Sequence, residues 1–256
     1  MKRNLVYTTL LLVGFIVSYF ASKILYFFNP AWATYLPKNA FLWHTSWFVL
    51  RLLPVACIAA LVSKKKILSD LGLSAKFLQP FLYALLFTMP MFIGFALVGK
   101  VNSEFNFNKV SSNCIYPGIF EEILVRSFLI GLLFRRLKWG FIPASLLGAL
   151  FFGAWHIYQG HDLLSSISAF LVTAAGSIWF GWLYLEWRFN AWINICLHIL
   201  MNFSWLLFSV EGGASGTIWA NVFRILTVVI SILLTIKIQS KKKGFIVNRK
   251  TLWSNA

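Results

Sequence analysis

Long apolar runs separated by short polar loops make up most of this chain. Each run has about 20 residues, enough to cross a hydrocarbon core of roughly 30 Å as a helix that rises 1.5 Å per residue. The pattern predicts an all-α, polytopic membrane protein with about eight transmembrane helices. The expected spans are residues 5–28, 41–62, 80–99, 115–134, 141–158, 163–185, 191–210 and 217–238.

The composition excludes a protein that folds mainly in water. Of the 256 residues, 59% are hydrophobic and 12% are charged, and the mean hydropathy is +0.77. A net charge of +16 would suggest a nucleic-acid partner for a soluble protein, but in membrane proteins lysine and arginine collect on cytoplasmic loops. We therefore expect the lipid bilayer as a partner and no nucleic acid.

The distribution of basic residues predicts the orientation of the helices. The chain ends and the loops after even-numbered spans carry sixteen lysines and arginines, whereas the opposite loops carry three, Lys38, Lys100 and Lys109. By the positive-inside rule, both termini are then cytoplasmic. The short chain with lysine-rich loops favours a bacterial cell membrane.

The spans divide the chain into three parts. Residues 1–114 would hold the first three transmembrane helices with their loops, residues 115–210 a core of helices four to seven, and residues 211–256 the last helix and a basic cytoplasmic tail. Cys57, Cys114 and Cys196 lie in apolar runs without a pairing pattern, so we interpret them as small core residues.

Two adjacent glutamates, Glu121 and Glu122, lie inside the predicted span 115–134. A charged side chain at the bilayer centre costs about 2.5–3.5 kcal/mol or more, and such residues usually mark functional sites. Arg126 follows Glu122 by four residues, on the same helical face, and could form a structural ion pair with it. That pair would explain one glutamate and leave the other, so we expect an intramembrane active site here.

Two further spans carry polar residues in pairs that are four residues apart. Phe152 and His156 lie in 141–158, and His198 and Asn202 lie in 191–210. Residues four apart project from one helical face, so each pair would point at a common place between helices. Taken singly, His156 is typical of a membrane interface, Phe152 of ordinary packing, and the His198–Asn202 pair of interhelical hydrogen bonding.

Other polar residues have simpler interpretations. Lys23, Arg51 and Arg224 have no partner in the sequence pattern and can extend their charged ends toward the membrane surface. His44 and His161 lie at span boundaries, where we expect contact with solvent.

The chemistry that such a set of residues can carry out is hydrolysis. A glutamate near a histidine can remove a proton from water and return it to a leaving amine. Asparagine and histidine can donate hydrogen bonds to a developing oxyanion. Two histidines and a glutamate, here His156, His198 and Glu121, would also suit a catalytic zinc ion with an open position for water.

Three motifs in this order resemble the CPBP family, the CAAX proteases and bacteriocin-processing enzymes also called Abi proteins. They are Glu-Glu-x-x-x-Arg at 121–126, Phe-x-x-x-His at 152–156 and His-x-x-x-Asn at 198–202. The sequence Asp-Leu-Gly-Leu at 70–73 is similar to a stretch that precedes the family core. The resemblance covers about residues 115–206 and implies an eight-helix intramembrane endopeptidase.

The resemblance also implies roles for the motif residues. Glu121 would activate the attacking water together with His156, while His198 and Asn202 would form the oxyanion side. Glu122 and Arg126 would orient Glu121, with Phe152 in a supporting position. Because the chain lacks His-Glu-x-x-His and has two adjacent glutamates, a site without a metal is favoured over zinc bound by Glu121, His156 and His198.

The expected substrate is a peptide or membrane protein: a pheromone, a bacteriocin precursor or a prenylated protein. One alternative function is a catalytically silent immunity or binding protein that retains the family core. A proton-coupled transporter is less favoured, since the chain lacks the paired broken spans that mark inverted repeats.

Overall fold

The computed structural model describes residues 2–36, 39–63, 66–210, 216–242 and 244–255, and the regular elements among them are helices, with no β-strand. The helices are α1 (Lys2–Tyr19), α2 (Ala21–Phe28), α3 (Ala40–Ser63), α4 (Ile67–Asp70), α5 (Leu78–Val98), α6 (Phe107–Val110), α7 (Tyr116–Glu121), α8 (Leu132–Leu137), α9 (Phe141–His156), α10 (Leu163–Glu186), α11 (Ala191–Leu207) and α12 (Ile218–Lys242). Two π-helical segments, η2 (Ser111–Ile115) and η3 (Glu122–Gly131), and two 3-10 turns, η1 (Trp32–Tyr35) and η4 (Ile157–Gln159), complete the set.

Five of these helices are long and apolar enough to cross a membrane: α3, α5, α9, α10 and α12. The pair α1 and α2 is bent by 70° and would be a sixth span if counted as one. The other two predicted spans correspond to α11, with 17 residues, and to the run through α7, η3 and α8. The protein is therefore all-α and polytopic, although length and composition in the described residues support five or six spans rather than eight.

The helical run that carries the glutamates is not a regular α-helix. It continues from α6 to α8 without a break and includes η2 and η3, in which hydrogen bonds join residues five apart. An apolar pattern does not distinguish this wider helix from an α-helix, so the span predicted at 115–134 carried no sign of its π-helical geometry. π-helical turns are rare and frequently lie at functional sites.

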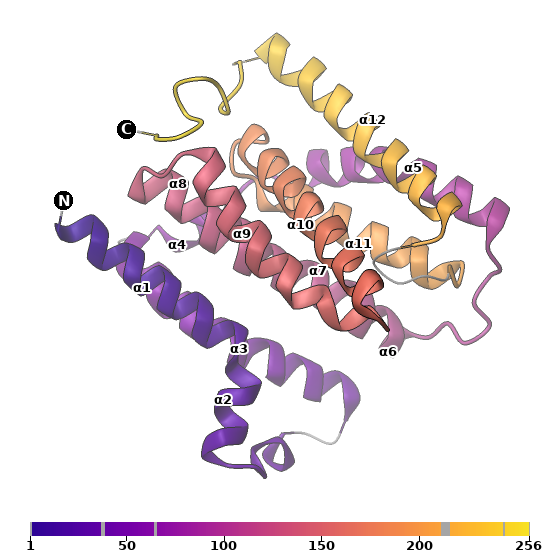
Figure 1. Ribbon diagram of the computed structural model, residues 1–256, viewed down its shortest axis with the longest axis horizontal. Helices are drawn as coiled ribbons and strands as arrows, with labels where there is room; N and C mark the ends of the chain where they lie inside the picture. Colours follow the sequence, from indigo (N-terminus) through magenta and orange to yellow (C-terminus); the bar gives the residue numbers. More distant parts are fainter. Residues whose placement is uncertain (1, 37–38, 64–65, 211–215, 243, 256) are drawn as a thin grey trace.

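This run lies in the middle of the molecule (Figure 1). α1 and α3 pack together on one side, α5 and α12 pack together on the other, and α9, α10 and α11 contact η3 directly. All ten residues of η3 are buried, and Leu124, Phe128 and Leu129 are fully enclosed by neighbouring helices. Because lipid tails are as apolar as leucine, close packing rather than water exclusion stabilises such a segment in a bilayer. Glu122 is thus held in a fully buried segment, and Glu121 precedes it directly at the end of α7.

The first and last described residues lie at the same end of the bundle (Figure 1), together with α4 and α8. Asp70, 1% exposed, accepts two hydrogen bonds from Arg136 at that end, at 2.6 and 2.8 Å. One neighbour in the predicted Asp-Leu-Gly-Leu stretch, Gly72, fits the turn after α10: its φ is +73°, and a Cβ there would lie 1.9 Å from the main-chain oxygen of Phe189. Of the lysines that predict the orientation, Lys38, Lys64, Lys65 and Lys243 lie outside the described residues.

The C-terminal residues 244–255 fold back onto the same end of the bundle. The main-chain oxygens of Thr251, Leu252 and Trp253 accept hydrogen bonds from the first N–H groups of α9 and the residue before it, at 2.9–3.2 Å. The buried carboxylate of Glu186 accepts two more from the main chain of residues 246 and 247, at 3.2 and 2.8 Å. The tail therefore caps a helix whose N-terminal donors would otherwise be unsatisfied.

Candidate active site

Glu122, Arg126 and His198 form a buried ion network between η3 and α11. Arg126 Nη1 donates to Glu122 Oε1 at 3.0 Å, and His198 Nδ1 lies 2.7 Å from the same oxygen. An ionised carboxylate only accepts hydrogen bonds, so Nδ1 of His198 is the protonated nitrogen. Glu122 is 0% and Arg126 is 2% exposed. The ion pair expected from the four-residue spacing is present, and its carboxylate also holds a histidine from another helix.

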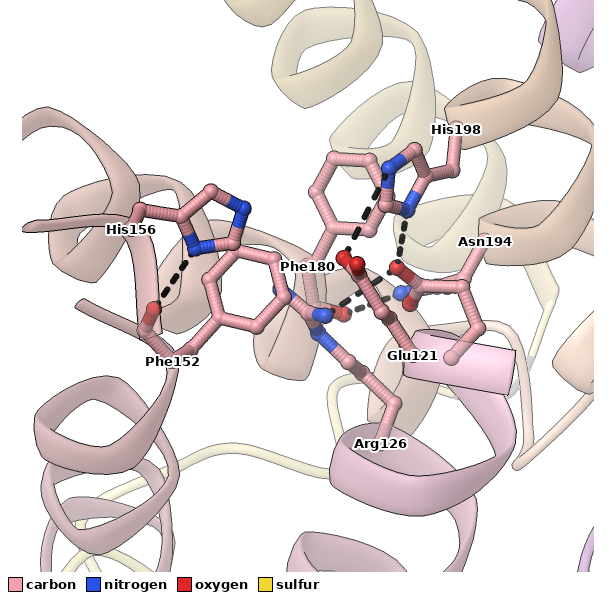
Figure 2. A network of polar contacts seen from close by, with 8 residues as sticks. Glu121, Arg126, Phe152, His156, Phe180, Asn194 and His198 are labelled. Carbon is pink, nitrogen blue, oxygen red and sulfur yellow. Dashed lines mark hydrogen bonds and ion pairs between the residues drawn. The ribbon is translucent and has the colours of Figure 1, made fainter. Parts of the chain in front are cut away.

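The Arg126 guanidinium lies between two aromatic rings. Its Cζ is 4.3 Å from the centre of the Phe152 ring and 5.0 Å from that of Phe180, and Figure 2 shows the three side chains together. A cation near an aromatic face is stabilised by about 0.5–2 kcal/mol. Phe152 thus supports the arginine that pairs with Glu122.

Glu121, the last residue of α7, lies beside His198 without bonding to it. Its Oε2 is 3.9 Å from His198 Nε2, beyond a direct hydrogen bond, and this oxygen has no hydrogen-bond partner among the described residues. A gap of this length between polar atoms suits a bridging water. The two side chains are each 14% exposed, so His198 faces the enclosed Glu122 with one nitrogen and the more open Glu121 with the other.

His156 lies apart from this network. Its Nδ1 is 2.7 Å from the main-chain oxygen of Phe152, and since a carbonyl only accepts, Nδ1 carries the proton and Nε2 of the neutral ring is an acceptor. The His156 and Phe152 rings are in contact, with centroids 4.5 Å apart. In Figure 2 the Phe152 ring lies between His156 and Arg126, and the free nitrogen of His156 is on the side that faces Glu121.

Asn202 is also separate from the glutamates. Its Nδ2 donates to the main-chain oxygen of Asn113, at 3.1 Å, and so joins α11 to η2. Asn194, which the sequence analysis did not select, is fully buried one turn before His198 (Figure 2); its Nδ2 donates to the main-chain oxygen of Phe180 at 2.7 Å. The four-residue spacing of Asn194, His198 and Asn202 was the signal that could have revealed it.

A cavity of about 200 Å³ adjoins Glu121, between α3, the η2–α7 segment and α9. Arg51 of α3 lines this cavity, with its Cζ 3.8 Å from the ring centre of Phe120 and 4.6 Å from that of Trp155. The expectation that Arg51 lacks a partner and extends toward the membrane surface was wrong, because aromatic residues of two distant segments enclose it.

The set expected for zinc is not assembled as a ligand group. Glu121 and His198 are neighbours, but His156 is hydrogen-bonded to the main chain on the far side of Phe152. Within the described part of the chain, no three His, Cys, Asp or Glu side chains are placed to hold a metal ion.

Residues 104–204 match the family model of the Rce1-like proteins, described as type II CAAX prenyl endopeptidase Rce1-like. No curated protein and no solved structure matches the chain. All three motifs lie within the matched segment, and the match supports CAAX-type intramembrane protease activity in general. The resemblance to the CAAX proteases is therefore confirmed by the similarity of residues 104–204 to the Rce1-like family.

Proposed function

We propose that the protein is an intramembrane endopeptidase in which Glu121 activates the water that attacks a peptide bond. The observation that carries this proposal is the free carboxylate oxygen of Glu121, which lacks a hydrogen-bond partner, lies 3.9 Å from a histidine nitrogen and adjoins a cavity. A general base must reach the proton that it removes directly or through one water. Glu122 also has an oxygen without a hydrogen-bond partner, but its Oε1 is tied to Arg126 and His198, and the side chain is buried and does not line the cavity.

The proposed reaction begins with a water held between Glu121 and Nε2 of His156. Glu121 takes one proton from this water as its oxygen adds to the substrate carbonyl carbon, which gives a tetrahedral oxyanion. Glu121 then returns the proton to the nitrogen of the scissile bond, and the carbon–nitrogen bond breaks to release an amine and a carboxylic acid. His156 suits this role because Nδ1 donates to the Phe152 carbonyl, which leaves Nε2 to accept a hydrogen bond from water.

His198 and Asn202 are the proposed donors to the oxyanion. When doubly protonated, His198 presents Nε2–H on the side of Glu121 while Nδ1–H remains bonded to Glu122. Asn202 would turn its Nδ2 from the Asn113 carbonyl to the substrate. Donors fixed before the reaction stabilise charge at no cost of reorganisation, so the ion network beneath His198 would act by holding this ring in place.

The proposed substrate is a membrane-associated peptide or protein: a prenylated protein, a pheromone or a bacteriocin precursor. The cavity beside Glu121 opens where α3 and α7 begin and α9 ends, at the end of the bundle away from α4 and α8. By the positive-inside rule, the distribution of basic residues favours a cytoplasmic position for the α4–α8 end.

The test is hydrolysis of a farnesylated CAAX peptide by the full-length protein in lipid nanodiscs, followed by mass spectrometry in water enriched in oxygen-18. We expect one labelled oxygen in the new carboxyl group, loss of cleavage in Glu121→Gln and His156→Ala, and retained cleavage in Glu104→Gln and His161→Ala, which alter exposed residues of loops. Cleavage should also survive a zinc chelator. If the Glu121→Gln variant cleaved the peptide as fast as the wild type, Glu121 would have no part in the mechanism.

A further inference from the structure

Arg51 is an intramembrane cation in an unusual setting. Its Cζ lies over the rings of Phe120 and Trp155, 3.8 and 4.6 Å from their centres, and 5.6 Å from the ring centre of Trp47. Phe120 directly precedes Glu121 and Trp155 directly precedes His156. The arginine from α3 thus touches the residues next to both members of the proposed water site.

Arg51 forms no ion pair within 4.0 Å among the described residues, although the carboxylate of Glu121 is near enough to act on its charge. Among the described residues, the ion pairs within 4.0 Å involve Lys109, Arg126, Arg135, Arg136 and His198, and Arg51 is in none of them. Its Nε makes one long hydrogen bond, 3.4 Å, to the main-chain oxygen of Ser18. Charged residues in membrane segments usually pair with one another or face a cavity, and Arg51 faces the cavity that it shares with Glu121.

The cavity has the features of a carboxylate site. A guanidinium that stacks on rings through its flat faces keeps its N–H groups free at the edge, in a geometry that matches a carboxylate. Ser112 and Tyr116 line the same space with hydroxyl groups. A volume of about 200 Å³ suits the short end of a peptide better than a chain that passes through.

We propose that Arg51 binds a carboxylate on the leaving segment of the peptide substrate, close to the bond that Glu121 cleaves. This inference rests on the proposed function for the position of the cleaved bond, whereas the binding of a carboxylate by Arg51 does not depend on it. The carboxylate is either the C-terminus of the substrate or an acidic side chain near that end, and both sources would satisfy the same guanidinium. Arg51 would then set the distance between the end of the substrate and the attacking water.

The test compares three farnesylated CAAX peptides in nanodiscs: one with a free C-terminal carboxylate, one with a carboxamide, and one carboxamide with aspartate as its last residue. For the wild type, we expect KM of the plain carboxamide to be about 10- to 100-fold above that of the acid, the range for loss of a hydrogen bond between charged groups. Arg51→Gln should raise KM for the acid to the carboxamide value and leave the carboxamide unchanged. The aspartate peptide separates the two sources, since it regains affinity only if a side-chain carboxylate suffices.

Two further variants distinguish carboxylate binding by Arg51 from a purely structural role. Arg51→Lys retains the charge without the planar stacking and should keep part of the preference for the acid. Arg224→Gln alters another intramembrane arginine, whose Cζ lies 5.6 Å from the ring centre of Trp205 in α11, and should keep the full preference. Equal loss of activity on all three peptides in Arg51→Gln, or an unchanged preference, would overturn the proposal.

Binding measurements separate this inference from the proposed function. Glu121→Gln protein should bind the acid peptide about 10- to 100-fold more tightly than the carboxamide, and Glu121→Gln with Arg51→Gln should bind the two alike. If the wild type cleaves nothing but this difference appears, the protease proposal fails and the carboxylate site stands. If the single variant binds both peptides equally, the carboxylate site is wrong whether or not the wild type is a protease.

Discussion

Arg126 is the residue whose replacement tests the buried ion network most severely. In Arg126→Met, Glu122 keeps its place at 0% exposure but loses the cation 3.0 Å away. Removal of one partner of a buried ion pair costs about 3–5 kcal/mol, and the lost contacts of the cation with Phe152 and Phe180 add about 0.5–2 kcal/mol. We therefore expect the free energy of unfolding to fall by at least about 3–5 kcal/mol.

A double-mutant cycle isolates the pair from general damage. Glu122→Gln should cost a similar amount, because it leaves Arg126 without its anion. The double variant should cost about 1–3 kcal/mol less than the sum, because neither charge is then left alone. The assay is reversible denaturant unfolding in micelles, followed by helical circular dichroism. Lys109→Met, which removes the cation of an exposed pair with Glu104, serves as the control and should have no measurable effect.

Single losses below about 1 kcal/mol for both Arg126→Met and Glu122→Gln would refute this reasoning. They would mean that water or lipid headgroups reach the pair and solvate the remaining charge. A coupling near zero would likewise mean that the two side chains do not depend on each other.

Three further predictions concern the stability of the fold. Gly72→Ala should lower the free energy of unfolding by at least about 1–3 kcal/mol, since φ is +73° and a Cβ would meet a main-chain oxygen at 1.9 Å; Gly176→Ala, where a Cβ meets nothing within 4 Å, is the control. Deletion of residues 244–255 should lower the thermal midpoint, because it exposes the buried carboxylate of Glu186 and uncaps α9; an unchanged midpoint would mean that the tail does not pack. The main-chain N–H and hydroxyl of Ser165 donate to Asp162 and lower the pKa of its carboxyl. The cap therefore stabilises α10 fully when the pH is above the unfolded pKa of about 3.9, and this stabilisation is lost as the pH falls through the folded pKa. Asp162→Asn should flatten the dependence of the thermal midpoint on acid pH.

Sequence reasoning identified the elements better than the partners. The glutamates with Arg126 were recognisable because a four-residue spacing on one helix fixes which side chains meet. The choice of His198 rather than His156 as the direct neighbour of the glutamates depends on how α9 and α11 are rotated about their axes, and no spacing within one helix contains that information.

Arg51 shows that partners from distant parts of the chain also escape sequence reasoning. Its aromatic partners come from α7 and α9, about 70 and 100 positions away along the chain. The sequence pattern therefore gave no sign that Arg51 has partners. The π-helical geometry of η3 was equally hidden, because burial on all sides selects the same apolar residues in either kind of helix. Packing between helices decides these features.

The most direct test of the central claim is the turnover number of Glu121→Gln on the farnesylated peptide, measured beside Glu104→Gln in the same nanodiscs. Removal of a general base lowers the rate by about 10²- to 10⁴-fold. We expect kcat to fall by at least that factor, with KM and thermal midpoint close to the wild-type values, while Glu104→Gln stays unchanged. A Glu121→Gln enzyme with kcat within a few-fold of the wild type would contradict the assignment of the attacking water to Glu121.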